Sequence, residues 1–418
     1  MELPKDFIQL IREQYGNDIA ETLFKALTET EPEVSIRLNR RKLCTLSSQI
    51  STLRLSPVPW CPDAFYIKGE RPAFTFDPLL HAGAYYVQEA SSMYIAQYIE
   101  QFKVQRAQRA SSPNGSSGST SQEGTPVVLD LCAAPGGKST LLASLLPEGS
   151  LLISNEPIPK RAQILCENMQ KWTRMPIGEE YPVASIVTNS YPADFRAMTD
   201  TVDLLLCDVP CSGEGMFRKD DEAVRQWSLD KVQQCQSLQR EILSDILHVL
   251  RPGGMLIYST CTFNHMEDED NVQWLQDKFG LQLLEQRHFL PGRDRGEGFF
   301  CAALTAPQPL KAYSNHPEGK ASYIPTEDVI RKVQKTLRVM SPAFELEDDA
   351  PQVELSYDEA LAYLRHEAIR VPAERGQVIL TYRGLPLGPG KCVGNRINNL
   401  YPQEWRIRTT YNKKFSIL

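Results

Sequence analysis

The stretch VVLDLCAAPGGKS, residues 127–139, decides the fold of this chain. Its apolar start predicts a buried strand, and its small residues predict a tight turn that leads into a helix. From there, short apolar segments alternate with helical ones as far as about residue 304. This alternation is typical of a parallel sheet with helices on both faces, so we expect an α/β, Rossmann-like core.

The turn of residues 132–138, CAAPGGK, has the properties of a ligand site. Small residues let a ligand approach the backbone, and the following helix presents its free N–H groups at the sheet edge where such folds bind nucleotides. The next predicted strand, LLISN, ends at Glu156, about 20 residues after Gly136. An acidic side chain there suits the ribose hydroxyls of an adenosine cofactor.

Other interpretations of this turn fit less well. The phosphate-binding loop of a nucleotide hydrolase would read GxxxxGK[ST], and the chain has Gly137, Lys138 and Ser139 but Cys132 in place of the first glycine. The dinucleotide pattern GxGxxG is also not matched. A turn that only connects strand and helix is the remaining alternative, and it does not explain the position of Glu156.

Two later strands each lead to a cysteine. The strand DLLLCD runs into VPCSGEG, and the strand GMLIYS runs into TCT, which places Cys211 and Cys261 just after strand ends. Because parallel strands end at one edge, we expect these thiols to converge with Asp208 on the glycine turn. A thiol at such a site can act as a nucleophile. Cys166, Cys207, Cys235 and Cys301 are expected to be packing residues.

A thiol, an acid and an adenosine cofactor together suit one reaction. A thiolate that adds to carbon 6 of cytosine makes carbon 5 able to accept a methyl group, while an acid hydrogen-bonds ring nitrogen 3. Cys211, Cys261 and Asp208 are therefore the predicted catalytic residues.

Composition limits the class of protein. With 418 residues, a net charge of −7 and 42% hydrophobic residues, the chain is expected to form two or three globular domains without a membrane span. The first residues lack a secretory pattern, so we expect a cytoplasmic location. Ten cysteines without repeated ligand spacing predict neither disulfides nor a metal site. We expect a monomer by default.

Basic residues gather in two places. Residues 375–418 hold eight basic residues against one acidic residue, interleaved with aromatic side chains, a mixture that predicts contact with nucleic acid. A second cluster, Arg37, Arg40, Arg41 and Lys42, allows RNA contact or a plain surface role. The predicted RNA contacts are Arg37, Arg383, Lys391, Arg396, Trp405 and Arg406.

Several segments together resemble a known family. LDLCAAPGGKST, LLLCDVPCSGEGMFRK, RPGGMLIYSTCTFN and GEGFF are similar to the Sun/RsmB family of S-adenosylmethionine-dependent RNA (cytosine-5) methyltransferases. The last of the basic segments, GLPLGPGKCVGNRINNLYPQEWRIR, resembles the PUA-like domain of its RsmF-type members. The resemblance covers nearly the whole chain and implies methylation of a cytidine in RNA, with 16S rRNA or the small ribosomal subunit as the favoured substrate and tRNA as an alternative.

The resemblance also implies roles for individual residues. Cys261 falls on the family's nucleophile and Cys211 on the cysteine that assists product release. The implied cofactor contacts are Cys132, Ala133, Ala134, Pro135, Gly136, Gly137, Lys138, Glu156, Arg161, Asn189 and Asp208. Asn189 stands near the place where the family often has an adenine-binding aspartate, so a non-catalytic RNA-binding assembly factor on the same fold is the rival interpretation.

We therefore expect a small N-terminal α+β domain that contacts RNA, a Rossmann-like catalytic domain and a C-terminal PUA-like, β-rich domain. The predicted limits are 1–105 for the N-terminal domain, 106–126 for a flexible Ser/Gly-rich insertion, 127–306 for the catalytic domain, 307–352 for a linker and 353–418 for the PUA-like domain.

Overall fold

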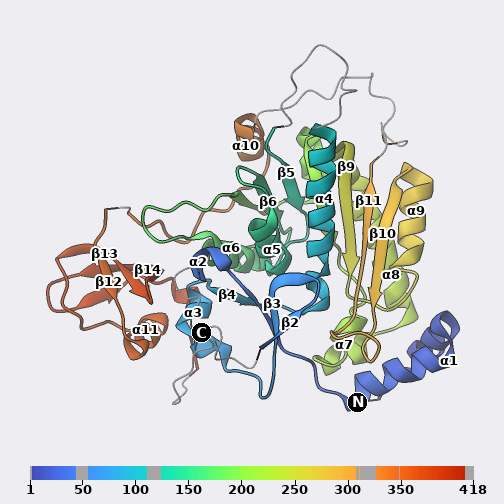
Figure 1. Ribbon diagram of the computed structural model, residues 1–418, viewed down its shortest axis with the longest axis horizontal. Helices are drawn as coiled ribbons and strands as arrows, with labels where there is room; N and C mark the ends of the chain where they lie inside the picture. The colour runs from blue at the N-terminus through green and yellow to red at the C-terminus, as the bar shows by residue number, and fades with distance from the viewer. Residues whose placement is uncertain are drawn as a thin grey trace, which may run out of the picture.

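The computed structural model describes residues 2–43, 55–110, 124–306, 310, 326–347 and 349–409. Most of the predicted insertion, much of the predicted linker and the last nine residues of the basic tail lie outside these ranges. The described helices and strands form a large central α/β unit, with a smaller sheet below it and a third sheet at one end (Figure 1).

A mixed sheet forms the centre of the molecule. Seven strands of the described chain pair in the order β10-β11-β9-β8-β5-β6-β7. β5 to β9 run parallel to one another. β11 is antiparallel to β9, and β10, at the edge of the sheet, is antiparallel to β11. The predicted Rossmann-like core is thus confirmed. The strand bounds are β5 Val127–Asp130, β6 Leu151–Asn155, β7 Ala184–Thr188, β8 Val202–Asp208, β9 Leu250–Thr260, β10 Gln282–Phe289 and β11 Phe299–Thr305.

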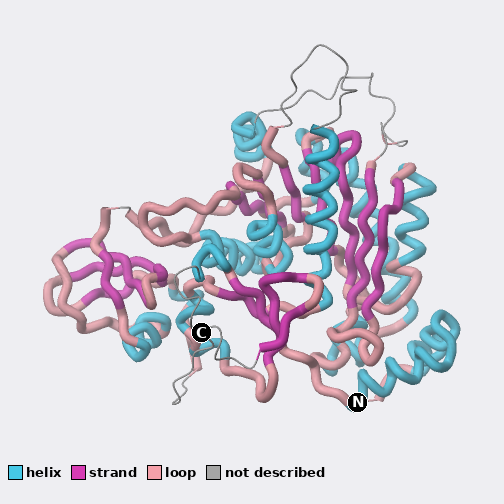
Figure 2. Tube along the Cα trace, viewed as in Figure 1, coloured by secondary structure: helices cyan, strands magenta, loops and turns pink. Residues whose placement is uncertain are grey.

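Helices cover both faces of this sheet (Figure 2). Successive side chains of a strand point to opposite faces, so Val128 packs in one apolar cluster while Val127 and Leu129 pack in another. The first cluster includes side chains of α4 Ile95–Ala110, α5 Gly137–Leu145 and α6 Pro159–Thr173. The second includes α8 Leu229–Ile246, α9 Glu269–Phe279 and α10 Thr326–Thr336.

The N-terminal and C-terminal units each contain a four-stranded sheet and share one apolar core. In that core Ile36 and Tyr85 of the first unit lie with Leu361 and Leu380 of the second. The N-terminal elements are α1 Lys5–Glu29, β1 Ser35–Leu38, α2 Arg40–Leu43, β2 Leu55–Val58, β3 Cys61–Ile67, α3 Pro78–His81 and β4 Tyr85–Val87. The C-terminal elements are β12 Gln352–Glu354, α11 Tyr357–Leu364, β13 Gly376–Tyr382, β14 Leu385–Cys392 and β15 Ile397–Asn399.

Helix α4 corrects the predicted domain limits. It continues to Ala110, past the point where we expected the flexible insertion to begin, and Ile99 and Phe102 pack in the core of the central sheet. Arg106 donates a hydrogen bond to Oδ1 of Asp203 over 2.8 Å. Gln108 and Arg109 lie on the exposed side of this helix. Composition alone does not distinguish the polar side of an amphipathic helix from a linker.

The N-terminal basic cluster also differs from expectation. Arg37 was predicted to contact RNA, but it is only 1% exposed and donates to Gln88 and to Thr140 of α5. Its guanidinium lies 4.4 Å from the ring centroid of Trp172. Lys42 is buried as well, and its Nζ donates to the carbonyls of Ala82 and Lys171. These two cations join the N-terminal unit to the central one, so the RNA role predicted for Arg37 is wrong.

None of the described helices has the length and apolar character needed to cross a membrane.

Candidate active site

The two predicted thiols lie side by side at the carboxyl edge of the central sheet. β8 and β9 pair in parallel with Asp208 opposite Ser259, so their following residues leave the sheet at the same level. The Sγ atoms of Cys211 and Cys261 are 3.1 Å apart, and both residues are partly exposed. The predicted convergence of the two cysteines is confirmed, because parallel strands open onto one edge.

Asp208 is held beside this thiol pair. Its Oδ1 accepts a hydrogen bond from Ser259 Oγ over 2.7 Å, and its Oδ2 lies 2.8 Å from Nζ of Lys138. Burial is the largest single effect and would lower the pKa of Lys138, but attraction to Asp208, Cys261 and Asp130 together outweighs burial and raises that pKa. The ion pair therefore ties the first turn of α5 to the thiol edge, and Lys138 is placed as a partner of Asp208.

The glycine turn is supported from outside by neighbouring side chains. Gly136 adopts a left-handed φ of 117°, a conformation that favours glycine. Arg161 donates to the carbonyl of Ala134 over 3.1 Å, and Asn168 donates to the carbonyl of Pro135 over 2.7 Å. These bonds fix the turn in one conformation.

Two buried carboxylate oxygens beside the turn have no hydrogen-bond partner among the described residues. One is Oε2 of Glu156, a residue only 1% exposed, whose Oε1 accepts from the N–H of Ile158. This Oε2 lies 3.5 Å from Nη2 of Arg161, an ion pair without a hydrogen bond. The other oxygen is Oδ1 of Asp130, where burial raises the pKa to about 7. Acceptors without a hydrogen bond suit ligand groups that donate one, such as the ribose hydroxyls and the amine of S-adenosylmethionine, so these residues fit that cofactor.

Sequence reasoning identified Glu156 but missed Asp130. Asp130 lies within the apolar strand from which we predicted the fold. An acidic residue in a strand predicted to be fully buried could have been recognised as a candidate site residue, because a buried charge needs a partner.

Asn189 lies next to this acidic edge. Its Nδ2 donates to the carbonyls of Glu156 and Pro157 over 2.8 and 2.9 Å, while no hydrogen bond to Oδ1 is found among the described residues. An amide oxygen is the acceptor that an adenine amine requires. The adenine contact of Asn189 stays a prediction.

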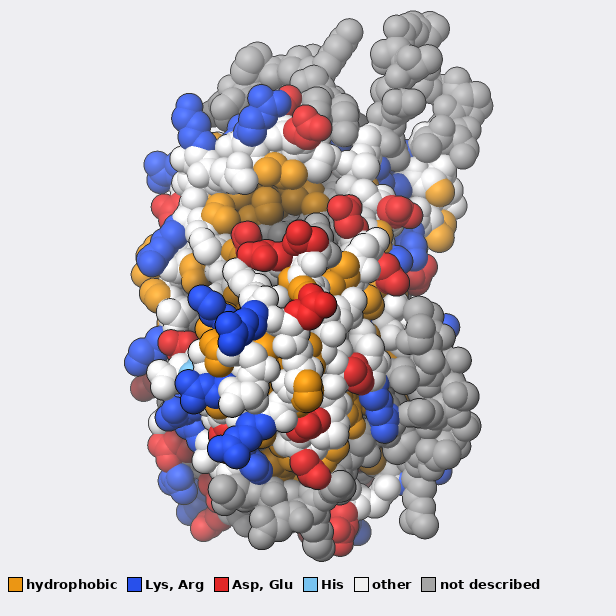
Figure 3. Space-filling view, turned by 90° about the vertical axis from the view of Figure 1, so that its left-hand side faces the viewer, with side chains coloured by type: hydrophobic (Ala, Val, Ile, Leu, Met, Phe, Trp, Pro, Cys, Tyr) orange, Lys and Arg blue, Asp and Glu red, His pale blue; other side chains and the backbone are white. Residues whose placement is uncertain are grey.

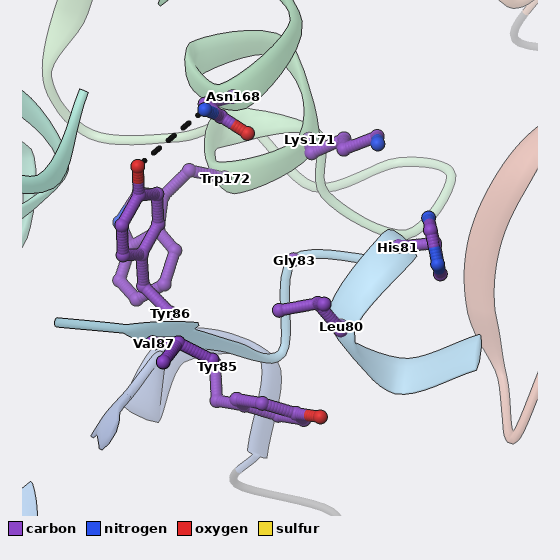
Figure 4. A pocket seen from close by; sticks show the side chains of 9 residues that line it. All are labelled: Leu80, His81, Gly83, Tyr85, Tyr86, Val87, Asn168, Lys171 and Trp172. Carbon is purple, nitrogen blue, oxygen red and sulfur yellow. Dashed lines mark hydrogen bonds between the residues drawn. The ribbon is translucent and has the colours of Figure 1, made fainter. Parts of the chain in front are cut away.

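A separate pocket of about 210 Å³ lies behind the glycine turn, where the N-terminal unit meets α6 (Figure 4). Tyr86 and Asn168 line it and hydrogen-bond each other over 3.4 Å. Its walls are mostly apolar and aromatic, and none of the catalytic candidates is part of them. The pocket marks the junction of the two units and is distinct from the thiol edge.

The predicted RNA contacts of the C-terminal unit divide by exposure. Lys391, Arg396 and Arg406 are exposed and Arg383 is partly exposed. Trp405 is also partly exposed, and its ring packs against Phe344 and Tyr401. On the end of the molecule seen in Figure 3, basic side chains gather along one flank, with acidic side chains beside them. The basic surface that could contact RNA is therefore confined to one part of this end of the molecule.

Three family profiles match this chain. Residues 120–305 match the 16S rRNA methyltransferase RsmB/F family, residues 3–90 the N-terminal domain of 16S rRNA methyltransferase RsmF, and residues 350–407 the methyltransferase RsmF PUA domain. Among curated proteins, ribosomal RNA small subunit methyltransferase F of Cronobacter sakazakii is 27% identical, with 96% of each chain covered. The protein of that name from Aeromonas hydrophila is 26% identical, with 96% of this chain and 97% of the relative covered.

Solved structures agree on the fold. A methyltransferase homolog protein from Pyrococcus horikoshii superimposes with a TM-score of 0.57 at 24% identity, over 72% of this chain and 95% of that one. NSun6 from Pyrococcus horikoshii with SFG gives a TM-score of 0.56 at 18% identity, over 72% of this chain and 98% of the other.

The central sheet, its covering helices and the ligand edge thus define a Rossmann-like methyltransferase with added N-terminal and PUA-like domains. More particularly, the chain belongs to the RsmB/F family of 16S rRNA methyltransferases.

Proposed function

We propose that the protein transfers a methyl group from S-adenosylmethionine to carbon 5 of a cytidine in RNA, with 16S rRNA as substrate. The contact of 3.1 Å between the thiols of Cys211 and Cys261 carries this proposal, because both sulfur atoms lie at the ligand edge beside Asp208. The names of the curated relatives support ribosomal RNA of the small subunit as the substrate.

In this proposal Cys261 is the nucleophile. Its thiolate adds to carbon 6 of cytosine, and the electron pair of the C5–C6 double bond becomes available at carbon 5. Asp208, held by Ser259 and Lys138, must carry a proton and donate it to ring nitrogen 3, where negative charge develops, and it takes this proton back when the adduct breaks down. Lys138, paired with Asp208, supplies a positive charge near Cys261.

Cys211 then completes the reaction. As a thiolate it removes the proton from carbon 5, the C5–C6 double bond forms again, and the bond between carbon 6 and Sγ of Cys261 breaks. Cys261 leaves as a thiolate and Cys211 becomes a thiol. The contact between the two sulfur atoms suits this exchange, because both must reach adjacent carbons of one ring.

The cofactor supplies the methyl group. We propose that Glu156 binds its ribose, that Asp130 and the turn of residues 132–138 bind its methionine end, and that Asn189 binds its adenine. Arg161 holds the turn through the carbonyl of Ala134.

RNA binding is assigned in this proposal to the PUA-like domain through Lys391, Arg396, Arg406 and Arg383. We also propose that the protein is a monomer. We propose that its domains have the limits predicted from the sequence, except that α4 belongs to the catalytic domain.

The test is methyl transfer from labelled S-adenosylmethionine to 16S rRNA, assembled small subunits and tRNA, followed by mapping of 5-methylcytosine. We expect Cys261→Ala to lose all detectable turnover. Cys211→Ala should accumulate a covalent protein–RNA adduct, because attack and methylation do not need the release step. Absence of methylation on every RNA, combined with RNA binding and no heat on titration with S-adenosylmethionine, would favour a binding factor instead.

A further inference from the structure

Two buried glutamates cross-connect the loops that hold the two thiols. Glu214 belongs to the loop of Cys211, yet its Oε2 accepts the backbone N–H of Phe263 in the loop of Cys261 over 2.6 Å. Glu267 follows Cys261 in the chain, yet its Oε2 accepts the backbone N–H of Ser212 over 3.0 Å. Each loop is thus bonded by a carboxylate that belongs to the other.

Asn264 joins the two carboxylates. Its Nδ2 donates to Oε1 of Glu214 and to Oε1 of Glu267, both over 2.9 Å. Trp227 donates to Glu214 over 2.8 Å, and Gln239 donates to Glu267 over 2.6 Å. Every oxygen of the two carboxylates therefore has a donor, and such a satisfied buried network holds its members in one arrangement.

Close backbone packing leaves the loops little freedom. The N–H of Gly215 donates to the carbonyl of Cys261 over 2.8 Å. A Cβ atom on Gly215 would lie 2.7 Å from the carbonyl oxygen of Gly298 and 3.0 Å from that of Cys261. The position of Cys261 is thus set by the loop of Cys211.

The two thiols differ in their electrostatic surroundings. The hydrogen bond with Cys261, burial, and the negative charges of Cys261 and Glu267 all raise the pKa of Cys211. Attraction to Cys261 is among the causes that raise the pKa of Lys138, which places this cation on the Cys261 side of the pair. Glu267 is bonded to the N–H of Ser212, the residue after Cys211, so the acidic neighbour and the cation lie near different thiols.

We propose that Glu267, held through Asn264 opposite Glu214, is a positioning residue whose charge keeps the proton of the thiol pair on Cys211 and leaves Cys261 as the thiolate. This inference rests on the proposed function. Once Cys261 is bonded to carbon 6, its charge no longer holds the proton, and Cys211 passes that proton to water. The charge of Glu267 then makes Cys211 a stronger base toward the proton on carbon 5, and the step returns Cys211 as a thiol and Cys261 as a thiolate.

The other titratable groups around the pair are Glu214, Asp208, Lys138, Tyr258 and Cys235. None of the substitutions below changes Asp208, Lys138, Tyr258 or Cys235, so a shift measured at Cys211 reports on the glutamates.

The first experiment follows alkylation of single cysteines by iodoacetamide against pH, read by peptide mass spectrometry. In the unaltered protein at pH 7 we expect Cys261 to be alkylated before Cys211, and the reverse order would overturn the proposal without any variant. In a Cys261→Ser background, Glu267→Gln should lower the pH midpoint of Cys211 alkylation by about one pH unit. This is the shift expected from loss of one nearby negative charge.

Glu214→Gln is the matched control, because it weakens the same network while the charge of Glu267 stays. It should leave the midpoint for Cys211 in place, and Glu267→Asp, which keeps the charge, should do the same. Equal shifts in Glu214→Gln and Glu267→Gln, or none in Glu267→Gln, would contradict a specific role for Glu267.

The second experiment measures single-turnover adduct formation and adduct decay against pH on 16S rRNA. Glu267→Gln should move the pH midpoint of adduct decay downward and slow decay at high pH, whereas a merely structural effect would slow both steps with unmoved midpoints. If no RNA adduct forms even in the unaltered protein, the proposed function fails. The alkylation experiment still decides whether Glu267 controls the thiol proton.

Discussion

The thiol edge and the junction between the N-terminal and central units both bury charge, but with opposite sign and different partners. At the thiol edge, Glu214 and Glu267 accept hydrogen bonds from backbone N–H groups of two loops. At the junction, Arg37 and Lys42 donate to backbone carbonyls, including the carbonyl of Lys171 near the end of α6. The free N–H groups of a loop need an acceptor, which a carboxylate supplies. The last turn of a helix such as α6 has free carbonyls, which need a donor such as a cation.

This difference shows what each buried charge does. A carboxylate can hold two loops together at a reactive site and tune the groups there. A cation instead docks one unit on another: Lys42 bonds the carbonyl of Lys171 in the last turn of α6, whereas Arg37 bonds Gly137 and Thr140 in the first turn of α5. Substitutions at the two regions should therefore affect different measurements.

The largest effect on stability is expected at the junction. Arg37→Met removes a guanidinium that donates to Gln88, Thr140 and Gly137 and leaves these acceptors buried. We expect a loss of about 3 kcal/mol in the free energy of unfolding, measured by urea denaturation.

Arg40→Met is the control for this prediction, since Arg40 lies three residues away, is exposed and forms an ion pair with Asp63. It should change stability by less than about 1 kcal/mol. Similar losses for both variants would remove the distinction between docking and surface cations.

The next effect concerns pH and the thiol edge. Burial, and then the charge of Glu267, raise the pKa of Glu214 to about 7 from an ordinary 4.5. The folded state therefore binds more protons than the unfolded state between these values, and stability falls as pH rises from 4.5 to 7, by an amount on the order of 3 kcal/mol. Glu214→Gln should reduce the fall in stability between pH 5 and pH 8 by about this amount, and should leave the part due to other buried carboxyls with a raised pKa, such as Asp130.

A matched control for the pH series is Glu354→Gln in the C-terminal unit, where the carboxylate accepts the N–H of Gly384. Its slope should stay that of the unaltered protein. If Glu214→Gln loses as much stability between pH 5 and pH 8 as the unaltered protein, this carboxyl does not titrate over that range in the folded state.

Lys42 should show the opposite sign. Burial lowers its pKa well below the ordinary 10.5, so the unfolded state binds the extra proton and stability rises with pH up to that value. Lys42→Met should flatten this rise, measured as the difference from the unaltered protein in the same denaturation series. A rise that persists in Lys42→Met would place its origin in other groups.

The smallest effect is expected on the exposed basic surface. Lys391→Gln combined with Arg396→Gln should weaken RNA binding and lower the slope of log affinity against log salt by about 1 to 2, since each phosphate contact contributes about 0.7 to 0.9. Fluorescence anisotropy with an rRNA fragment at several salt concentrations measures this.

Arg331→Gln on α10, also exposed and paired with Asp328, is the control and should leave the salt slope unchanged. Equal slopes for all three proteins would argue against phosphate contact at Lys391 and Arg396.

Local patterns were enough for the central fold and for the convergence of the thiols. Alternating strands and helices specify a parallel sheet, and the ends of adjacent parallel strands must share an edge, so the positions of Cys211, Cys261 and Asp208 followed from their places along the chain. The turn at Gly136 and the acidic Glu156 were likewise readable from spacing.

Local sequence patterns did not predict which polar residues are buried. Arg37 and Lys391 are equally basic in the sequence, yet one bonds to Thr140, 103 residues further on, and the other faces solvent. Likewise, the exchange of partners between Glu214 and Glu267 exists only once two loops meet. The sequence by itself determined the order of strands, turn and reactive residues, because periodicity and spacing are local. Only the tertiary structure decided which charges are buried and what they bond, because those contacts join segments far apart in the chain.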